Sequence, residues 1–402
     1  MSVDFQPGGG ERWRSPWAQY AALRDHDPVH HVVPAARPGA DHFVLSRHAD
    51  VLAAAVDTAT YSSAQGLTTE YGELEAIGLA DNPPMVMLDP PEHTAFRRLV
   101  ARGFTPRAVR EVEPRVRAFV VERLDRLVAA GGGDIVSELL KPLPSMVVAH
   151  YLGVPDADRA QFDGWTEAIV AASSSGEPTG AADATMEMLG YFGALIERRR
   201  SEPGDDTVSH LVSAGVGDDP AGLLSVLAYV FTMVTGGNDT TTGALGGAVQ
   251  LLAEHPDERA RLVADPSLIG DAVEEFLRLT SPVQALARTT TREVELHGRR
   301  IPAGRKVLLL YAAANRDPRR YGLDADSLDV GRRPSQILTF SQGSHHCIGA
   351  AAARMQARVA LEELLARCPD FTVDDAAITW APGSYVRRPT CVPIRTRPQP
   401  NG

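Results

Sequence analysis

Residues 340–349 read FSQGSHHCIG, and this stretch decides how the rest of the chain is interpreted. It places His345 and His346 directly before Cys347, with Gly343 and Gly349 on either side. A thiol in this setting could be a zinc ligand, a nucleophile, a redox switch or an axial ligand of an iron. Evidence from the remainder of the sequence is needed to distinguish these four kinds of site.

Composition excludes several classes of protein. The chain has 402 residues and 44% hydrophobic content, enough for a large core. A net charge of −11 argues against nucleic acid as a partner. Three cysteines, an odd number, fit a reducing cytosol better than a disulfide framework, so we expect a cytoplasmic protein. The most apolar run, 223–234, is shorter than the roughly 20 residues that cross a bilayer, so we expect no membrane anchor.

Helical periodicity dominates the chain. Residues 113–131 carry apolar side chains three and four apart and end on a glycine, which predicts a surface helix. Short strand candidates lie at 42–46, in a hairpin at 293–311 and in the tail. The pattern predicts a mainly α protein with a smaller β region (α+β). We expect a single domain over 1–402, β-rich at about 28–60, 283–311 and 370–397 and helical elsewhere.

A helix of about 35 residues should run from Pro220 to His255, because Asp219-Pro220 is a start signal and His255-Pro256 a stop. Its first half is apolar on nearly every side, which predicts a path through the centre of the protein. The middle reads TGGNDTTTG (235–243), and each of its two adjacent glycines costs about 1 kcal/mol in a helix. This composition predicts a bulge or kink around a functional group; close packing at the glycines is the alternative.

The residues around Cys347 do not favour all four kinds of site equally. Zinc is disfavoured, because structural zinc sites use ligands spaced by two to five residues. A nucleophile needs a base, which a histidine could supply, but no oxyanion arrangement is identifiable. For iron, Gly343 and Gly349 let the backbone close around the sulfur, and the helix predicted to follow offers N–H groups to a thiolate.

The pattern Phe340-x-x-Gly343-x-His345-x-Cys347-x-Gly349 resembles the haem-binding signature of the cytochrome P450 family. Further motifs of that family follow in the expected order over nearly the whole chain. The resemblance implies a P450-like fold with the long central helix across the haem. It also implies haem b, bound through these five signature residues, with Cys347 as the axial ligand of the iron.

Two other segments resemble P450 motifs that surround the haem. GGNDTT (236–241) is similar to the oxygen-activation motif, which implies that Asp239 and Thr240 deliver protons. DPPEHTAFRRLV (89–100) resembles the helix that holds a haem propionate, which gives that role to His93 and Arg97. Arg288 matches the other propionate-binding arginine, and His345 is implied to share this task.

Glu275 and Arg278 match the family's Glu-x-x-Arg motif, and Arg332 is the expected third member of a buried, structural charge cluster. The pattern alone is weak, since Glu11–Arg14, Glu197–Arg200 and Glu258–Arg261 also fit it. Position selects the Glu275 pair, which precedes the cysteine signature by about 70 residues.

The resemblance implies a monooxygenase (an EC 1.14 enzyme) that inserts one oxygen atom from O2 into a C–H bond, by hydroxylation or epoxidation. The substrate would be a lipophilic small molecule such as a terpenoid, fatty acid, steroid or polyketide. The expected pocket residues are mostly apolar or small: Thr232, Thr235, Gly236, Val283, Leu286 and Val386, with Tyr385 beside them.

Electrons would come from a separate ferredoxin or flavodoxin with its NAD(P)H reductase, because the chain has no G-x-G-x-x-G fingerprint. Seven arginines between 97 and 117, with Arg354 and Arg358, could form a basic docking face; a solvated helix face is the alternative. We expect a monomer. Three other functions stay open: a peroxygenase or non-oxygenating member of the same fold, a non-catalytic haem-binding protein, and a haem-free cysteine hydrolase.

Overall fold

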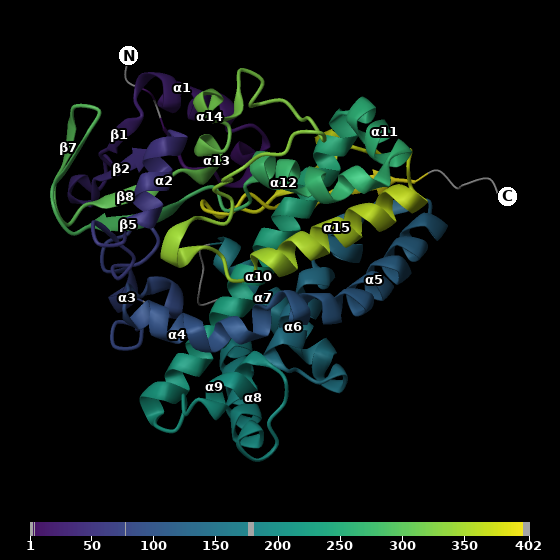
Figure 1. Ribbon diagram of the computed structural model, residues 1–402, viewed down its shortest axis with the longest axis horizontal. Helices are drawn as coiled ribbons and strands as arrows, with labels where there is room; N and C mark the ends of the chain where they lie inside the picture. Colours follow the sequence, from purple (N-terminus) through teal and green to yellow (C-terminus); the bar gives the residue numbers. More distant parts are fainter. Residues whose placement is uncertain (1–2, 4, 77, 176–180, 397–402) are drawn as a thin grey trace.

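The long central helix is present in the computed structural model, which describes residues 3, 5–76, 78–175 and 181–396. It is α10 (Pro220–Glu254), and both predicted ends are confirmed. The Asp219 side chain accepts a hydrogen bond from the backbone N–H of Gly222 at 2.7 Å, and the helix ends before His255. Figure 1 shows α10 passing through the middle of the molecule.

The expected path through the centre is confirmed (Figure 1), although the second half, from Thr241 to Gln250, is more buried than the first, where Leu224 is 50% exposed. The expected bulge is wrong, because the α-helix is continuous through 235–243. There the Asn238 amide N–H and the Thr240 hydroxyl donate hydrogen bonds to the carbonyls four residues earlier, so these donors are satisfied inside a regular helix.

Close packing, the alternative that the sequence left open, holds for Gly237 but not for Gly236, where a Cβ would meet nothing within 4 Å. A Cβ on Gly237 would lie 2.7 Å from the Val148 side chain of α6 (Pro142–Leu152). Cβ atoms on Gly243 and Gly246 would lie 2.6 Å from the Arg387 carbonyl and 2.4 Å from Pro389. Because Gly243 and Gly246 have no side chain, the backbone of the C-terminal segment can pack directly against the helix at these two positions.

The other helices surround α10 (Figure 1). Earlier in the chain come α1 (Trp17–His26), α2 (His48–Val56), α3 (Glu73–Ala76), α4 (Glu92–Val100), α5 (Pro106–Ala129), α7 (Arg159–Ser175), α8 (Ala182–Ser201) and α9 (Thr207–Ser213). Later in the chain come α11 (Pro256–Ala264), α12 (Ile269–Thr280), α13 (Tyr311–Ala314), α14 (Pro318–Tyr321) and α15 (Ala350–Arg367). The surface helix predicted from 113 begins seven residues earlier, at Pro106, because Thr105 caps it.

The main sheet has the order β1-β2-β8-β5-β3 and packs beside α1 and α2. Its strands are β1 (Val29–Val32), β2 (His42–Leu45), β3 (Tyr61–Ser62), β5 (Leu286–Thr290) and β8 (Lys306–Leu309). The smaller sheets comprise β4 (Gly132–Asp134), β6 (Val294–Leu296), β7 (Arg299–Ile301), β9 (Thr372–Val373), β10 (Thr379–Trp380), β11 (Pro389–Cys391) and β12 (Pro393–Arg395). The predicted α+β class is confirmed.

The predicted β-rich segments contain most of these strands, and β3 begins one residue after the first segment ends. The clear exception is β4, in a region that we expected to be helical; it pairs with β12, with Gly133 opposite Ile394. Arg397, the last residue of the predicted third β-rich segment, lies outside the described residues.

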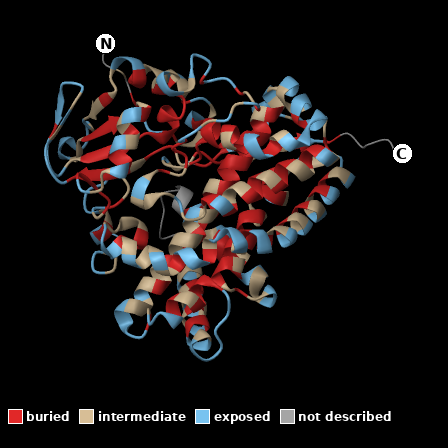
Figure 2. Ribbon diagram, in the orientation of Figure 1, coloured by how far each residue is buried: buried red, intermediate tan, exposed pale blue. Residues whose placement is uncertain are grey.

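The largest core lies where α5, α10, α12 and α15 meet, and Figure 2 shows buried residues along the inner faces of these helices. Val116 and Val120 of α5 and Val359 of α15 are all fully buried there. Among the described helices, α10 alone is long and apolar enough to cross a membrane, a test that core helices of soluble proteins also pass. This core holds α15 rigidly, and the cysteine signature lies at its N-terminal end.

Candidate active site

The signature folds into a tight turn that ends at α15. The Cys347 N–H donates to the Phe340 carbonyl at 2.8 Å, and the His346 N–H donates to the Gly343 carbonyl at 3.1 Å. Gly343 has a φ of +71°, which favours glycine, and a Cβ there would lie 3.0 Å from the Val56 Cα of α2. The turn therefore depends on glycine for both its conformation and its packing.

Cys347 is an exposed residue in this structure, although protein atoms lie close around its thiol. Burial raises the pKa of the Cys347 thiol, while the Gly349 N–H and the guanidinium groups of Arg97 and Arg354 oppose that rise. Cys368, in contrast, is buried in the core. Cys347 thus lies just before the N-terminus of α15, and the Gly349 N–H and two guanidinium groups stabilise a negative charge on its sulfur.

Four basic side chains from three parts of the chain meet next to this turn; we call them the basic cluster. They are His93 and Arg97 of α4, Arg288 of β5 and His345 of the signature. The rings of His93 and His345 lie 4.1 Å apart, and Arg97 donates to the His346 carbonyl at 2.6 Å. Arg288, 2% exposed, donates to the Ala287 carbonyl at 2.8 Å.

No carboxylate forms an ion pair with the basic cluster among the described residues. The nearby Asp89 is bound by Ser62 and Ser63 instead. Burial, with the neighbouring Arg288, His93 and Arg97, lowers the pKa of His345 to about 3. The Nδ1 atom of His93 is buried with no hydrogen-bond partner in the described part of the chain. Such a set of groups fits an anion.

On α10 the predicted acid–alcohol pair has an unpredicted partner. Asp239 Oδ1 lies 2.7 Å from Arg388 Nε, and both side chains are nearly buried. Thr240, the next residue, donates to the Gly236 carbonyl at 2.8 Å. A Cβ on Gly236 would meet nothing within 4 Å, so the helix faces open space at this position.

The charged side chains of the Glu-x-x-Arg motif meet as expected. Glu275 and Arg278, both fully buried, share two hydrogen bonds of 2.7 Å. Arg332 Nε adds a third contact to Glu275 at 3.1 Å. The other three matches of the motif also form ion pairs, but each of those pairs includes an arginine that is 32–47% exposed.

Known proteins share both the sequence and the fold. A family model described as Cytochrome P450 matches residues 183–375. The chain is 67% identical over 398 residues to Cytochrome P450 130 of Mycobacterium tuberculosis, covering 98% of each. It is 38% identical over 368 residues to Vitamin D(3) 25-hydroxylase of Pseudonocardia autotrophica, covering 90% of this chain and 89% of that protein. It matches the structure of cytochrome P450 CYP109Q5 from Chondromyces apiculatus with a TM-score of 0.85 and 33% identity, over 98% and 99% of the two chains.

The chain belongs to the cytochrome P450 family. It is therefore a P450 monooxygenase, and the family implies a haem cofactor. The residues present fit that cofactor: an exposed cysteine, an open space beside Gly236, and basic groups that lack a carboxylate partner in the described chain. A P450 haem carries two propionates, which are anions of the kind that the basic cluster suits.

The residues expected to line the P450 substrate pocket fall into two groups. Thr232, Thr235 and Gly236 lie on one face of α10, where both threonines donate to carbonyls of the preceding turn. Val283 and Val386 form an antiparallel bridge, and Leu286 begins β5 nearby in sequence. That the two groups line one pocket stays a prediction.

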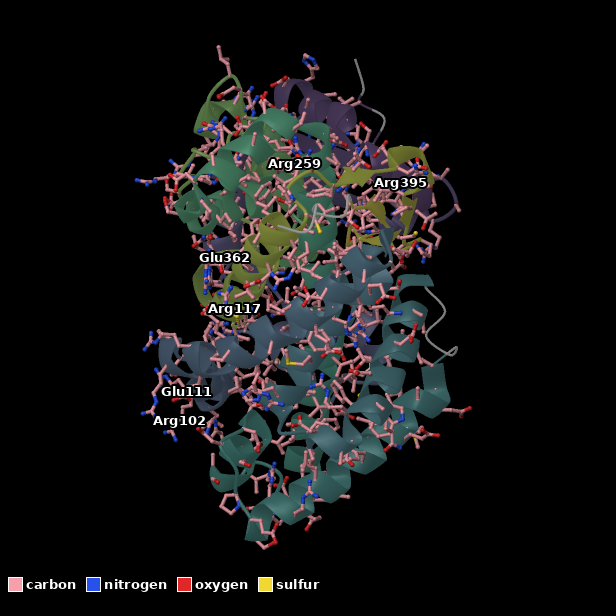
Figure 3. The ribbon with its side chains drawn as sticks, turned by 90° about the vertical axis from the view of Figure 1, so that its right-hand side faces the viewer. Arg102, Glu111, Arg117, Arg259, Glu362 and Arg395 are labelled. Carbon is pink, nitrogen blue, oxygen red and sulfur yellow. The ribbon has the colours of Figure 1, made fainter. Side chains whose placement is uncertain are left out.

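The expected basic docking face for a P450 electron donor is largely neutralised. Arg117 contacts Glu113, Glu362 and Glu363, while Arg358 contacts Glu113 and Glu362. Figure 3 shows Arg117 beside Glu362, with Arg102 and Glu111 further along the same edge. Arg107, Arg115 and Arg354 also pair with acids, and Arg97 points to the signature. Arg98, Arg102 and Arg110 form no ion pair within the described residues.

Sequence reasoning missed Arg388 and Ser63. Ser63 Oγ lies 3.2 Å from His345 Nε2, a hydrogen bond that helps to orient the histidine ring. Neither residue belongs to a motif, since each acts across more than a hundred residues of sequence. In the sequence, Arg388 is visible only as one of two adjacent arginines before Pro389.

Proposed function

We propose that Cys347 is the axial thiolate ligand of a haem b and that the basic cluster holds the haem propionates. The observation that carries this proposal is the exposed Cys347 next to basic groups with no acidic partner among the described residues. Phe340, Gly343 and Gly349 would shape the turn around the sulfur, and Arg354, stacked 4.6 Å from the centre of the Phe340 ring, would support it. When bound, haem supplies the oxygen chemistry; the protein supplies geometry, protons and exclusion of water.

Replacing Arg288 with leucine should weaken haem retention, because leucine keeps apolar volume but removes a buried cation from the propionate side. We expect the dissociation rate of haem to apomyoglobin to rise about tenfold or more, as the loss of one charge-assisted bond implies. Arg300→Leu is the matched control, since Arg300 is 73% exposed. Equal haem loss in the two variants would contradict the propionate role.

We further propose that Asp239 and Thr240 move protons to the reacting oxygen. The Thr240 hydroxyl donates to the Gly236 carbonyl, so its oxygen can still accept a hydrogen bond from water at the open side of α10. Asp239 is nearly buried beside Arg388, and the 2.7 Å contact between them fixes the direction of its carboxylate. The pair would then accept and release protons without rearranging the helix.

Thr240→Ala should keep haem binding but lower the yield of product per NAD(P)H consumed by about tenfold or more, with hydrogen peroxide formed instead. Peroxide release and NAD(P)H oxidation, measured with surrogate redox partners, check this. Thr240→Ser retains the hydroxyl and should stay coupled. If Thr240→Ala is as tightly coupled as the parent enzyme, Thr240 has no part in proton delivery. Efficient turnover with peroxide alone would indicate a peroxygenase instead.

The proposed substrate is a lipophilic small molecule, hydroxylated or epoxidised. The expected pocket residues carry no charge, and the 38% identical relative is named for 25-hydroxylation of vitamin D(3), a lipophilic compound. A terpenoid, fatty acid, steroid or polyketide fits the same description. Spectral titration of the haem protein with a library of these classes and of charged compounds tests the proposal, and binding only of charged compounds would overturn it.

The proposed electron donor is a ferredoxin or flavodoxin with its NAD(P)H reductase. Arg98, Arg102 and Arg110 are the cations of the 97–117 region that remain free for an acidic partner within the described chain. We also propose that the chain works as a single domain over 1–402, as a monomer in the cytoplasm.

A further inference from the structure

A small cavity of about 60 Å³ lies away from the haem-side residues, where five segments meet. Its walls come from the last turns of α10 and α12, from α1 with the residues just before it, from the residues between α13 and α14, and from the C-terminal segment on α10. Three arginines, Arg14, Arg316 and Arg387, line it together with Trp17, Gln250, Thr280 and the exposed residue Glu254. Two of these guanidinium groups are almost completely buried, which is costly unless each has a counter-charge.

Arg387 has no such counter-charge. It is 5% exposed, and no carboxylate lies within ion-pair distance among the described residues. Its Nε donates to the Trp13 carbonyl at 2.7 Å, and its Nη2 has a long contact of 3.4 Å to Gln250 Oε1. The guanidinium stacks 4.1 Å from the Trp380 ring centre. These contacts hold its position but do not neutralise it.

Arg316 is the second cation of the cavity, and it is only partly satisfied. It is 5% exposed, and it contacts Asp326 at 3.1 Å and the Leu279 carbonyl at 3.0 Å. Its Nε is buried with no partner in the described chain. Its guanidinium carbon lies 3.7 Å from the ring centre of Trp17, and that of Arg387 lies 5.3 Å from the same ring.

The electrostatics are unfavourable without an anion. Burial, followed by repulsion from Arg316, lowers the pKa of Arg387 to about 9. The nearby acids are exposed at the rim, where Glu254 and Asp375 both accept hydrogen bonds from Gln250 Nε2. Arg387 therefore forms no ion pair with a carboxylate of the described residues, and Glu254 and Asp375 offset its charge only from beyond ion-pair distance.

We propose that this cavity binds one small monovalent anion, chloride in the cell, between Arg316 and Arg387. A water molecule needs about 10–15 Å³ of such space, so the cavity has room for a monatomic anion with water beside it. A single negative charge balances the one guanidinium of the two that forms no ion pair within the described residues. The anion would tie α1, α10 and α12 to the C-terminal segment, in which Arg388 contacts Asp239.

Diffraction from crystals of the haem-loaded enzyme grown in sodium bromide tests the site directly. We expect an anomalous difference peak between the Arg316 and Arg387 guanidinium groups. Density explained by water alone, with no anomalous signal, would overturn the proposal. This measurement uses the natural sequence and does not depend on how any variant folds.

Thermal unfolding at constant ionic strength provides the matched test in solution. Replacing sodium gluconate by sodium chloride should raise the Tm of the parent enzyme by about 1–3 °C, because the anion binds only the folded state. Arg387→Met, which keeps length without charge, should lose this difference. Arg126→Gln, on an arginine that is 53% exposed, should keep it. The same chloride effect in both variants would show a general salt effect and overturn the site.

Discussion

Cys347→Ala should abolish the red-shifted Soret band that the reduced protein shows with carbon monoxide, because that band reports thiolate ligation of the haem iron. Cys347 is exposed, and its sulfur receives the Gly349 N–H and the fields of Arg97 and Arg354, whereas alanine offers no ligand. Monooxygenase activity should fall to background. The measurement is a difference spectrum on reconstituted protein, with haem content determined separately.

The other two cysteines provide the controls for this experiment. Cys368→Ala and Cys391→Ala remove a thiol from the core and from the edge of a small sheet, and both should keep the red-shifted band. Persistence of the band in Cys347→Ala would mean that another residue is the axial ligand. Its loss from all three variants would point to general damage.

The local parts of the site were predictable from sequence because their physics is local. The turn around Cys347 needs glycine at Gly343 for a positive φ, and a glycine requirement is visible as a fixed spacing in the signature. The start of α10 was equally predictable, because the Asp219 side chain caps it by accepting a hydrogen bond from the N–H of Gly222, three residues later. Where one short segment contains both the backbone conformation that is needed and the residue that allows it, the sequence alone predicts the local structure.

The parts that sequence did not reveal depend on contacts between distant segments. Asp239 and Arg388 meet because Gly243 and Gly246 let the C-terminal segment lie against α10, which no local pattern records. The docking face was overestimated for the same reason. Its arginines were taken from 97–117 and from Arg354 and Arg358 without regard to their neighbours. In the structure Arg117 and Arg358 form ion pairs with acids of α5 and α15.

Glu275→Gln should destabilise the protein by about 3–5 kcal/mol, the typical cost of breaking a buried ion pair from one side. Arg278 is fully buried, and the carboxylate of Glu275 accepts from both its Nε and its Nη2 at 2.7 Å. Glutamine keeps the volume but leaves the charge of Arg278 unbalanced. The midpoint of urea unfolding, followed by circular dichroism, measures the loss.

Glu197→Gln is the matched control, because Glu197–Arg200 has the same spacing on α8 with Glu197 68% exposed. It should change the free energy of unfolding by about 0.5 kcal/mol or less. Similar losses in the two variants would show that position and burial do not distinguish the two motifs.

The effect of Glu275→Gln should also reach the haem. Arg278 Nη1 donates to the Asn315 carbonyl at 2.8 Å, and the Asn315 side chain binds Thr339 Oγ1 at 2.9 Å and the Leu338 N–H at 2.7 Å, directly before Phe340. This chain of hydrogen bonds connects the charge cluster to the turn that holds Cys347. Haem dissociation should therefore accelerate in urea concentrations too low to unfold the protein, and only in the Glu275 variant. Unchanged dissociation there would limit the cluster to global stability and separate it from the cysteine turn.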